Sequence, residues 1–257
     1  MDDETLDDID LNYCQSNGAF FGTSRLGEVV ENQDVYLSCC GAPSAAFNTA
    51  FLKGPIRDLD ACIRRAREYF GDKKLPYRIT LRDDLVGDCA DGLSAAGYRE
   101  VERMPGMLMR PIRDGSKRHP QLRVRPVETR EDLAHFQETA FAGFALPAAA
   151  APLFLTEQLW ARPNVRFYLG TIGGEPACTS ALVTTESVAG IYWVATLDVF
   201  RRRGLGEAIT WEAVKGGIDA GCVVASLQAS ALGEPVYQRM GFETPLYYVH
   251  FETESAK

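Results

Sequence analysis

The hydrophobic and polar positions of the first half of the chain follow two periods, which separate expected strands from expected helices. Apolar runs and strict alternation predict strands, whereas apolar residues three or four positions apart predict helices. In chain order, these patterns predict a helix at 5–13, strands at 35–40 and 46–52, a helix at 57–70, a strand at 77–81, a helix at 84–96 and a strand at 107–109. Asn17-Gly18 is expected to form a turn, and Gly71 to end the second helix. This order indicates an α/β layer.

The second half begins after a polar segment, residues 111–120, which is the best domain boundary in the chain. We therefore expect one domain over residues 1–115 and another over residues 120–257. Thr129 is expected to cap the first helix of the second domain, because acidic residues follow it. The other expected elements are strands at 122–127, 167–171, 177–185, 190–200, 223–227 and 247–251, and helices at 148–160, 207–220 and 233–240.

Composition narrows the class of protein. The 257 residues are 46% hydrophobic and carry a net charge of −8, which argues against nucleic acid or an anionic membrane as the main partner. No apolar run approaches the roughly 20 residues that a membrane helix needs, and the acidic N-terminus is unlike a signal peptide. The seven cysteines and three histidines are scattered, so we expect reduced thiols, a cytoplasmic location and no metal.

The stretch Arg201-Arg202-Arg203-Gly204-Leu205-Gly206 lies between an expected strand and an expected helix. Glycines let a backbone approach a ligand closely, and a helix N-terminus offers unpaired N–H groups that suit a phosphate. Arginines add bidentate donors for phosphate oxygens. Taken alone, the stretch is equally compatible with an ordinary strand-to-helix turn that carries a solvated basic run.

Three features in this order resemble the GNAT superfamily of acetyl-CoA-dependent N-acyltransferases. A strand ending in residues 195–199 leads into Arg201-x-x-Gly204-x-Gly206, a further strand precedes residues 230–237, and Tyr237-x-x-x-Gly241-Phe242 follows. The resemblance covers residues 121–252. It implies a fold that contains both helices and strands, of the α/β (α+β) class. Its sheet would be mixed, antiparallel at its centre and flanked by helices. The first half also ends in a helix, Gly97-Tyr98 and a strand, so we interpret it as a degenerate GNAT-like module in tandem, or else as an unrelated cap.

The resemblance also implies roles for particular residues. Acetyl-CoA would be the cosubstrate, and Tyr237 would give a proton to the departing thiolate, unless it only packs against the cofactor. The family often has Asn where this chain has Ser230, which weakens the expected contact there. The residues implied in cofactor binding are Leu197, Asp198, Val199, Arg202, Arg203, Gly204, Leu205, Gly206, Glu207, Ser230 and Tyr237.

The residues that would accept the proton and bind the acceptor are less defined. Glu186, Asp198 and Glu234 are base candidates, although each is more typical of a surface or capping carboxylate. Strand alternation would direct either Tyr192 and Thr196 or Trp193 into an acceptor cleft, not both rows. Asn48 in the first half is read either as a polar contact in a cleft or as a residue that satisfies a turn.

The sequence therefore predicts an N-acetyltransferase that acts on a small amine or amino-acid-like acceptor. The alternatives are a CoA-binding module without catalysis, acting as a sensor or structural partner, and an acetyltransferase of protein amino groups. A homodimer is compatible with the sequence, which does not set the oligomeric state.

Overall fold

The computed structural model describes residues 3–115 and 119–253, and their contacts form two compact units. Unit 1 combines the segment up to Ser16 with Met107–Glu243, and unit 2 combines Asn17–Gly106 with the residues from Thr244 on. Three elements therefore contribute to both units, namely α1 (Asp3–Gly22), β5 (Tyr98–Met109) and β11 (Glu243–Thr253). Within the described residues, no helix combines the length and the hydropathy that a bilayer crossing requires.

Unit 2 is a mixed sheet with two helices, in the strand order β1-β2-β3-β4-β11-β5. The first three strands are antiparallel, β4 runs parallel to β3, and β11 is antiparallel to β4. Its remaining elements are β1 (Glu28–Glu31), β2 (Val35–Cys39), η1 (Ala45–Phe47), β3 (Asn48–Leu52), α2 (Leu59–Lys73), β4 (Arg78–Arg82) and α3 (Asp83–Ala95). Residues at helical spacing on α2, Ile63, Ala66 and Phe70 among them, are buried in the core of this unit.

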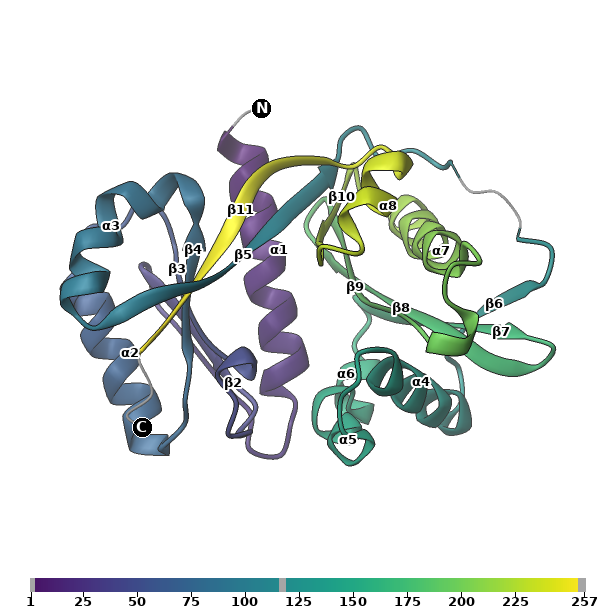
Figure 1. The fold of residues 1–257 in the computed structure, drawn as a ribbon, viewed down its shortest axis with the longest axis horizontal. Helices are drawn as coiled ribbons and strands as arrows, with labels where there is room; N and C mark the ends of the chain where they lie inside the picture. Colours follow the sequence, from purple (N-terminus) through teal and green to yellow (C-terminus); the bar gives the residue numbers. More distant parts are fainter. Residues whose placement is uncertain (1–2, 116–118, 254–257) are drawn as a thin grey trace. The chain divides into compact units, whose positions relative to one another are not determined.

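Unit 1 has the strand order β5-β10-β9-β8-β7-β6, in which β6 to β9 form an antiparallel meander and β10 runs parallel to β9. Helices α4 and α7 cover opposite faces of this sheet (Figure 1). Its elements are β6 (Leu122–Pro126), α4 (Arg130–Gly143), η2 (Ala148–Ala150), α5 (Ala151–Phe154), α6 (Glu157–Trp160), β7 (Val165–Ile172), β8 (Glu175–Thr185), β9 (Val188–Thr196), η3 (Asp198–Phe200), α7 (Leu205–Asp219), β10 (Val224–Gln228) and α8 (Glu234–Met240).

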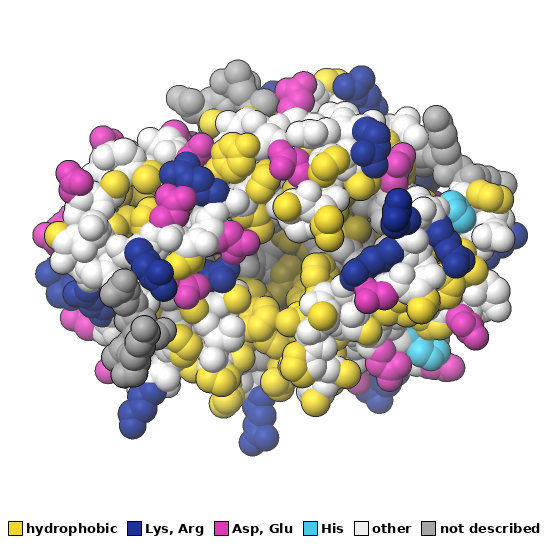
Figure 2. All heavy atoms as spheres, viewed as in Figure 1, with side chains coloured by type: hydrophobic (Ala, Val, Ile, Leu, Met, Phe, Trp, Pro, Cys, Tyr) yellow, Lys and Arg dark blue, Asp and Glu magenta, His cyan; other side chains and the backbone are white. Residues whose placement is uncertain are grey.

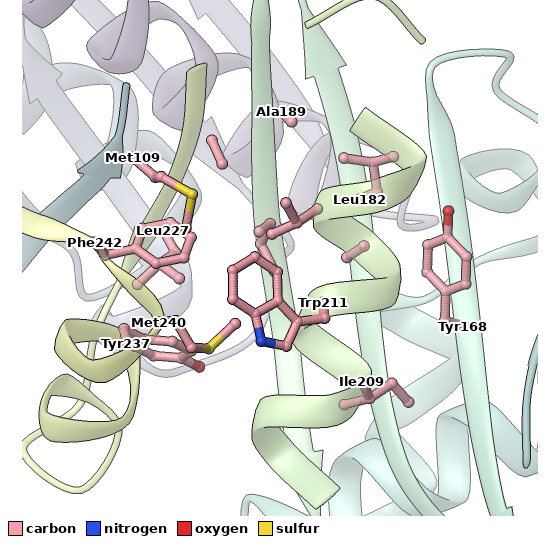
Figure 3. Close-up of a cluster of buried hydrophobic side chains, with 14 of the residues drawn as sticks. Met109, Tyr168, Leu182, Ala189, Ile209, Trp211, Leu227, Tyr237, Met240 and Phe242 are labelled. Atoms are coloured by element: carbon pink, nitrogen blue, oxygen red, sulfur yellow. The ribbon is translucent and has the colours of Figure 1, made fainter. Parts of the chain in front are cut away.

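One core cluster of unit 1 lies between α7 and the sheet. Figure 3 shows Ile209 and Trp211 of α7 among side chains from the strands, with Tyr237 and Met240 of α8 beside them. Trp211 is 6% exposed, and an indole of this size buries a large apolar area, so it is a major contributor to the stability of the unit.

The predicted fold class is confirmed, and so are many local signals. Thr129 and Asp132 form a reciprocal capping box at the start of α4. Gly173 and Gly174 turn the β7–β8 hairpin with positive φ values of 61° and 93°. The amide of Asn48 donates to the carbonyls of Ala42, Ser44 and Pro76, so its role is structural. All seven cysteines are buried and free.

Two expected interruptions were wrong, because glycine serves another purpose there. Asn17-Gly18 is not a turn; α1 continues to Gly22, and a Cβ on Gly18 would lie 1.8 Å from the Tyr36 hydroxyl. Gly18 therefore allows close packing rather than a change of direction. Helix α2 also continues past Gly71 and ends where Lys74 takes the left-handed conformation, with φ of 54°.

The expected helix over residues 148–160 was also wrong. The chain forms η2, α5 and α6 instead. Leu155 leaves the helical conformation with ψ of 62°, and its carbonyl accepts a 2.7 Å hydrogen bond from the Gln137 amide. Thr156 then caps α6 by accepting from the Leu159 N–H. The strand expected at 190–200 ends at Thr196, and η3 follows it.

The compact units differ from the domain division expected at residues 115–120. Residues 3–16 and 107–115 belong with the second half, and the last strand, β11, belongs almost wholly with the first. The polar composition of residues 111–120 predicts a connection between domains, but composition carries no information about which strand pairs with which.

A buried amide on α1 bonds the N-terminal segment to two strands of unit 1. Asn12 on α1 is fully buried, and its Nδ2 donates to the Val183 carbonyl at 3.0 Å. Its Oδ1 accepts from the Tyr192 hydroxyl at 2.7 Å. A Cβ on Gly190 would lie 2.0 Å from the same Oδ1, so glycine at that position is needed for this contact. Asn12 thus joins α1 to both β8 and β9.

We predict that Asn12→Ala lowers the free energy of unfolding by about 2 kcal/mol, because it leaves buried polar groups of Val183 and Tyr192 without this partner. Chemical denaturation of the full chain measures this value. Asn164→Ala is the matched control, since its amide donates to the Thr184 carbonyl from an exposed position and should cost less than about 0.5 kcal/mol. Equal effects of the two substitutions would contradict the account.

Candidate active site

A cavity of about 710 Å³ lies within unit 1, where the end of β9, the first turn of α7 and the segment from β10 to α8 meet. Its lining contains seven of the residues that the sequence implicated in cofactor binding, and these residues come from three separate stretches. The lining residues are Gly143–Ala145, Val194–Thr196, Phe200–Arg202, Gly204–Glu207, Ser230, Leu232, Gly233, Val236, Tyr237 and Arg239.

The cavity forms because β9 and β10 separate. Their parallel register ends at Gly190 and Ser226, although β9 continues to Thr196 and β10 to Gln228. On its other side β9 stays paired with β8 as far as Thr196. The edge of β9 that faces the cavity therefore carries backbone groups that are not paired with β10. Such an edge can bind a ligand that carries amide groups, as an added strand would.

A β-bulge at Trp193 determines which residues of β9 reach the cavity. Thr179 pairs with Ala195 and Ala181 pairs with Tyr192, so two residues of β9 oppose one of β8. Trp193 has a φ of 51°, and its carbonyl accepts a 2.9 Å hydrogen bond from the Thr179 hydroxyl. Because the bulge interrupts alternation, the three successive residues Val194–Thr196 line the cavity.

The bulge also changes the expected acceptor residues. Thr196 lines the cavity, but Tyr192 and Trp193 do not. The Tyr192 hydroxyl is bonded to Asn12, and the Trp193 indole is stacked on Phe141 with ring centroids 5.4 Å apart. The choice between two alternating rows was therefore wrong, because the strand does not keep a period of two through residue 193.

The turn before α7 presents free N–H groups to the cavity. Gly204 has a φ of 78° and precedes the helix, and its carbonyl accepts the first intrahelical bond from the Ala208 N–H at 3.0 Å. The N–H groups of Leu205, Gly206 and Glu207 consequently have no acceptor inside the helix. These N–H groups lie at the positive end of the α7 dipole, which favours an anion at this position.

The arginines of the turn have different partners. The Arg201 guanidinium donates to the carbonyls of Thr196 at 3.2 Å and Gly143 at 2.8 Å, so it holds the turn against β9 and α4. The Arg203 guanidinium lies 5.5 Å from the centre of the Phe200 ring. Arg202 and Arg239 both line the cavity, and neither forms an ion pair with another described residue. Figure 2 shows Lys and Arg side chains gathered over α7 and α8.

Tyr237 is the titratable group that lies deepest in the lining. It is 8% exposed, and in Figure 3 its hydroxyl points toward α7. Burial raises the pKa of Tyr237 to about 12, and the Thr210 hydroxyl opposes this increase. Thr210 itself donates to the Gly206 carbonyl at 2.7 Å, so α7 connects the surroundings of Tyr237 with the glycine turn.

Several implicated residues lie away from the lining. Leu197, Asp198, Val199 and Arg203 do not contribute to it. The Leu197 N–H donates to the Ala177 carbonyl, the Asp198 carboxylate is 2.8 Å from Arg201, and Val199 is 72% exposed. Leu197, Asp198 and Val199 follow the end of β9 and lie at the start of η3, so they are not part of the edge of the strand.

The three base candidates are also outside the lining. Glu186 lies between β8 and β9, the Asp198 carboxylate pairs with Arg201, and Glu234 accepts a hydrogen bond from Gln238. Among the described lining residues, Glu207 is the carboxylate, and it belongs to the first turn of α7.

Sequence reasoning did not single out Arg239, the α4 end at Gly143–Ala145, or Val194 and Val236. Arg239 follows Tyr237 by two positions in the short helix α8. Its positive charge close to Tyr237 was the sequence signal that could have indicated a contact with an anionic ligand. The α4 end could not be found in this way, since residues 143–145 carry no chemical group that distinguishes them.

Ser230 reaches the cavity but has a local role as well. Its hydroxyl accepts from the Gly233 N–H at 3.2 Å, and its carbonyl accepts from the N–H groups of Gly233 and Glu234. These bonds begin α8 and so help to place Tyr237. The hydroxyl proton of Ser230 remains able to donate one hydrogen bond.

Comparison with known proteins gives a consistent family. The family model described as "Acetyltransferase (GNAT) domain" matches residues 103–233. A GCN5-related N-acetyltransferase from Kribbella flavida is similar in structure, with 19% identity, a TM-score of 0.73 and coverage of 97% of this chain and 96% of that one. A tandem GNAT protein from the clavulanic acid biosynthesis pathway has 16% identity, a TM-score of 0.62 and coverage of 95% and 89%. Comparison with curated proteins gave no match.

We predict that Gly206→Val weakens CoA binding at least about tenfold, because its methyl groups would occupy the space in front of the free amides. Gly206→Ala is the matched control: its Cβ would meet Thr196 Oγ1 at 3.7 Å, an ordinary contact, and we expect binding within about twofold of the parent. Calorimetric titration with CoA measures both. Unchanged binding by Gly206→Val would show that CoA does not use this turn.

Proposed function

The chain belongs to the GNAT acetyltransferase family, and from that premise we propose that it transfers the acetyl group of acetyl-CoA to the amino group of a small, amino-acid-like molecule. Acetyl-CoA-dependent acetyl transfer is the activity of the family. The observation that carries the proposal is the cavity itself. One end presents helix-terminal amides that have no acceptor inside α7, and the same space is lined by Tyr237 and by the part of β9 that is not paired with β10.

Three groups of residues would bind the cosubstrate. The N–H groups of Leu205, Gly206 and Glu207 would hold the diphosphate, and Arg202 and Arg239 would add charge beside it. The edge of β9 at Val194–Thr196 would pair with the amides of the pantetheine arm. The Ser230 hydroxyl, which already accepts from the Gly233 N–H, would donate one hydrogen bond near the same arm.

Tyr237 would stabilise the departing thiolate mainly as a hydrogen-bond donor. Its pKa is raised to about 12, whereas a thiol resembling cysteine has a pKa of about 8.5. Complete proton transfer from the phenol to the thiolate would be uphill by about 3.5 pKa units, or about 5 kcal/mol. A hydrogen bond from the protonated phenol stabilises the developing negative charge without that cost.

The proton of the attacking amine would leave through water. An alkylamine with a pKa of about 10.4 is largely protonated at pH 7, so it must lose a proton before it attacks. Glu207 is the one carboxylate among the described lining residues, and it lies at the proposed diphosphate site rather than beside Tyr237. Water in the cavity is therefore the proton acceptor that we propose.

The lining near the end of β9 favours a small acceptor. Gly143, Phe144, Ala145, Val194 and Ala195 are uncharged there. The net charge of −8 disfavours polyanions, so we propose no nucleic acid partner, and a cationic amine that loses its proton in the site fits best.

We predict that the parent protein releases the CoA thiol with at least one small primary amine. Tyr237→Phe should lower kcat about 10- to 100-fold while the Kd for acetyl-CoA changes less than about threefold, because the substitution removes only a hydrogen-bond donor. A free-thiol assay across a panel of amines, amino acids and short peptides checks this. Binding of acetyl-CoA without thiol release from any acceptor would favour a non-catalytic CoA-binding module, and release with peptides alone would favour a protein acetyltransferase.

The pH profile tests the role of Tyr237 separately. Because burial raises the pKa of Tyr237 to about 12, the phenol stays protonated below about pH 11. The value of kcat/KM should then rise with pH, up to about tenfold per unit below the pKa of the acceptor amine. Steady-state rates from pH 7 to 10 measure the profile. A decline within this window that Tyr237→Phe abolishes would contradict the assignment.

A further inference from the structure

His119 makes three hydrogen bonds immediately before β6. Its Nδ1 accepts from the backbone N–H groups of Gln121 at 3.3 Å and Leu122 at 3.1 Å. Its Nε2 lies 3.0 Å from the carbonyl oxygen of Arg203. A carbonyl can only accept, so Nε2 must carry the proton, and Nδ1 must be unprotonated to accept two N–H groups. The contacts therefore select the neutral tautomer with hydrogen on Nε2.

The bond to Arg203 determines the orientation of one peptide group. The carbonyl of Arg203 and the N–H of Gly204 belong to the same trans peptide, so they point in opposite directions. Gly204 lines the cavity, whereas His119 and Arg203 do not. With the Arg203 carbonyl directed to His119, the Gly204 N–H points the opposite way, away from His119.

Part of the turn is strained, so contacts that hold its backbone help to maintain its shape. Arg202 and Gly204 both have left-handed φ values, of 63° and 78°. A non-glycine residue in this region is strained by roughly 1 kcal/mol or more. Arg201 holds the turn on one side through the carbonyls of Thr196 and Gly143. His119 holds the peptide that follows the strained Arg202–Arg203 step.

We propose that His119 is a positioning residue for the diphosphate of CoA. By holding the Arg203 carbonyl, it turns the Gly204 N–H toward the cavity, where this N–H joins those of Leu205, Gly206 and Glu207 as a donor to phosphate oxygens. The inference rests on the proposed function, because it assumes that CoA binds at this turn. It assigns a role to a histidine that touches neither the acetyl group nor the acceptor.

The test compares three variants with two acetyl donors. His119→Ala should raise the KM for acetyl-CoA about tenfold with little change in kcat. It should leave the KM for acetyl-pantetheine, which lacks the diphosphate, unchanged. His119→Gln should restore the KM for acetyl-CoA to within about threefold of the parent, because its amide can donate to the Arg203 carbonyl. His135→Ala, on α4 and away from the turn, is the matched control and should behave like the parent.

The outcomes separate this inference from the proposed function. A parent protein that binds no CoA in calorimetric titration contradicts the proposed function. A parent that binds CoA, together with a His119→Ala variant that binds it equally well, overturns the role of His119 alone. Equal losses with acetyl-CoA and acetyl-pantetheine also overturn it, because they indicate general damage. Should His119→Ala not fold, nitrogen NMR of the parent decides: we expect the tautomer protonated on Nε2, and protonation on Nδ1 overturns the inference.

Discussion

The site depends on the separation of two parallel strands. If β9 and β10 stayed paired beyond Gly190 and Ser226, their hydrogen bonds would fill the space in which the cavity lies. The separation leaves backbone groups of β9 without a partner in β10, and such groups are costly to bury unless another protein group, water or a ligand pairs with them. The bulge at Trp193 adds to this arrangement, because it directs three successive residues toward the cavity. A binding site for an amide-containing arm thus follows from a departure from regular sheet structure.

The turn into α7 supplies the second requirement, a place for negative charge. Free amides are useful only if the backbone holds them in one direction. The left-handed conformation of Arg202 makes that direction costly to maintain, whereas Gly204 adopts such a φ without strain. Arg201 bonds the turn to β9 and α4, and His119 bonds it to the start of β6. The side chains of Arg201 and His119 therefore hold the backbone of the turn, whereas those of Arg202 and Arg239 remain available to a ligand.

Local chemistry could be predicted from the sequence, whereas long-range pairing could not. The capping box at Thr129, the Gly173-Gly174 hairpin and the helix after Gly204 follow from short-range rules. Strands β5 and β11 each contribute residues to both compact units, and no short-range sequence pattern indicates this. The domain division expected near residue 115 therefore differs from the division of the contacts. The bulge at Trp193 likewise depends on register with β8.

The central claim is that the cavity of unit 1 binds acetyl-CoA at the turn before α7 and places its sulfur near Tyr237. A crystal structure of the protein with CoA tests this most directly. The account predicts diphosphate oxygens within hydrogen-bond distance of the N–H groups of residues 205–207, the pantetheine arm along β9, and the thiol beside the Tyr237 hydroxyl. Density for CoA elsewhere on the protein, with this cavity holding only water, would contradict it.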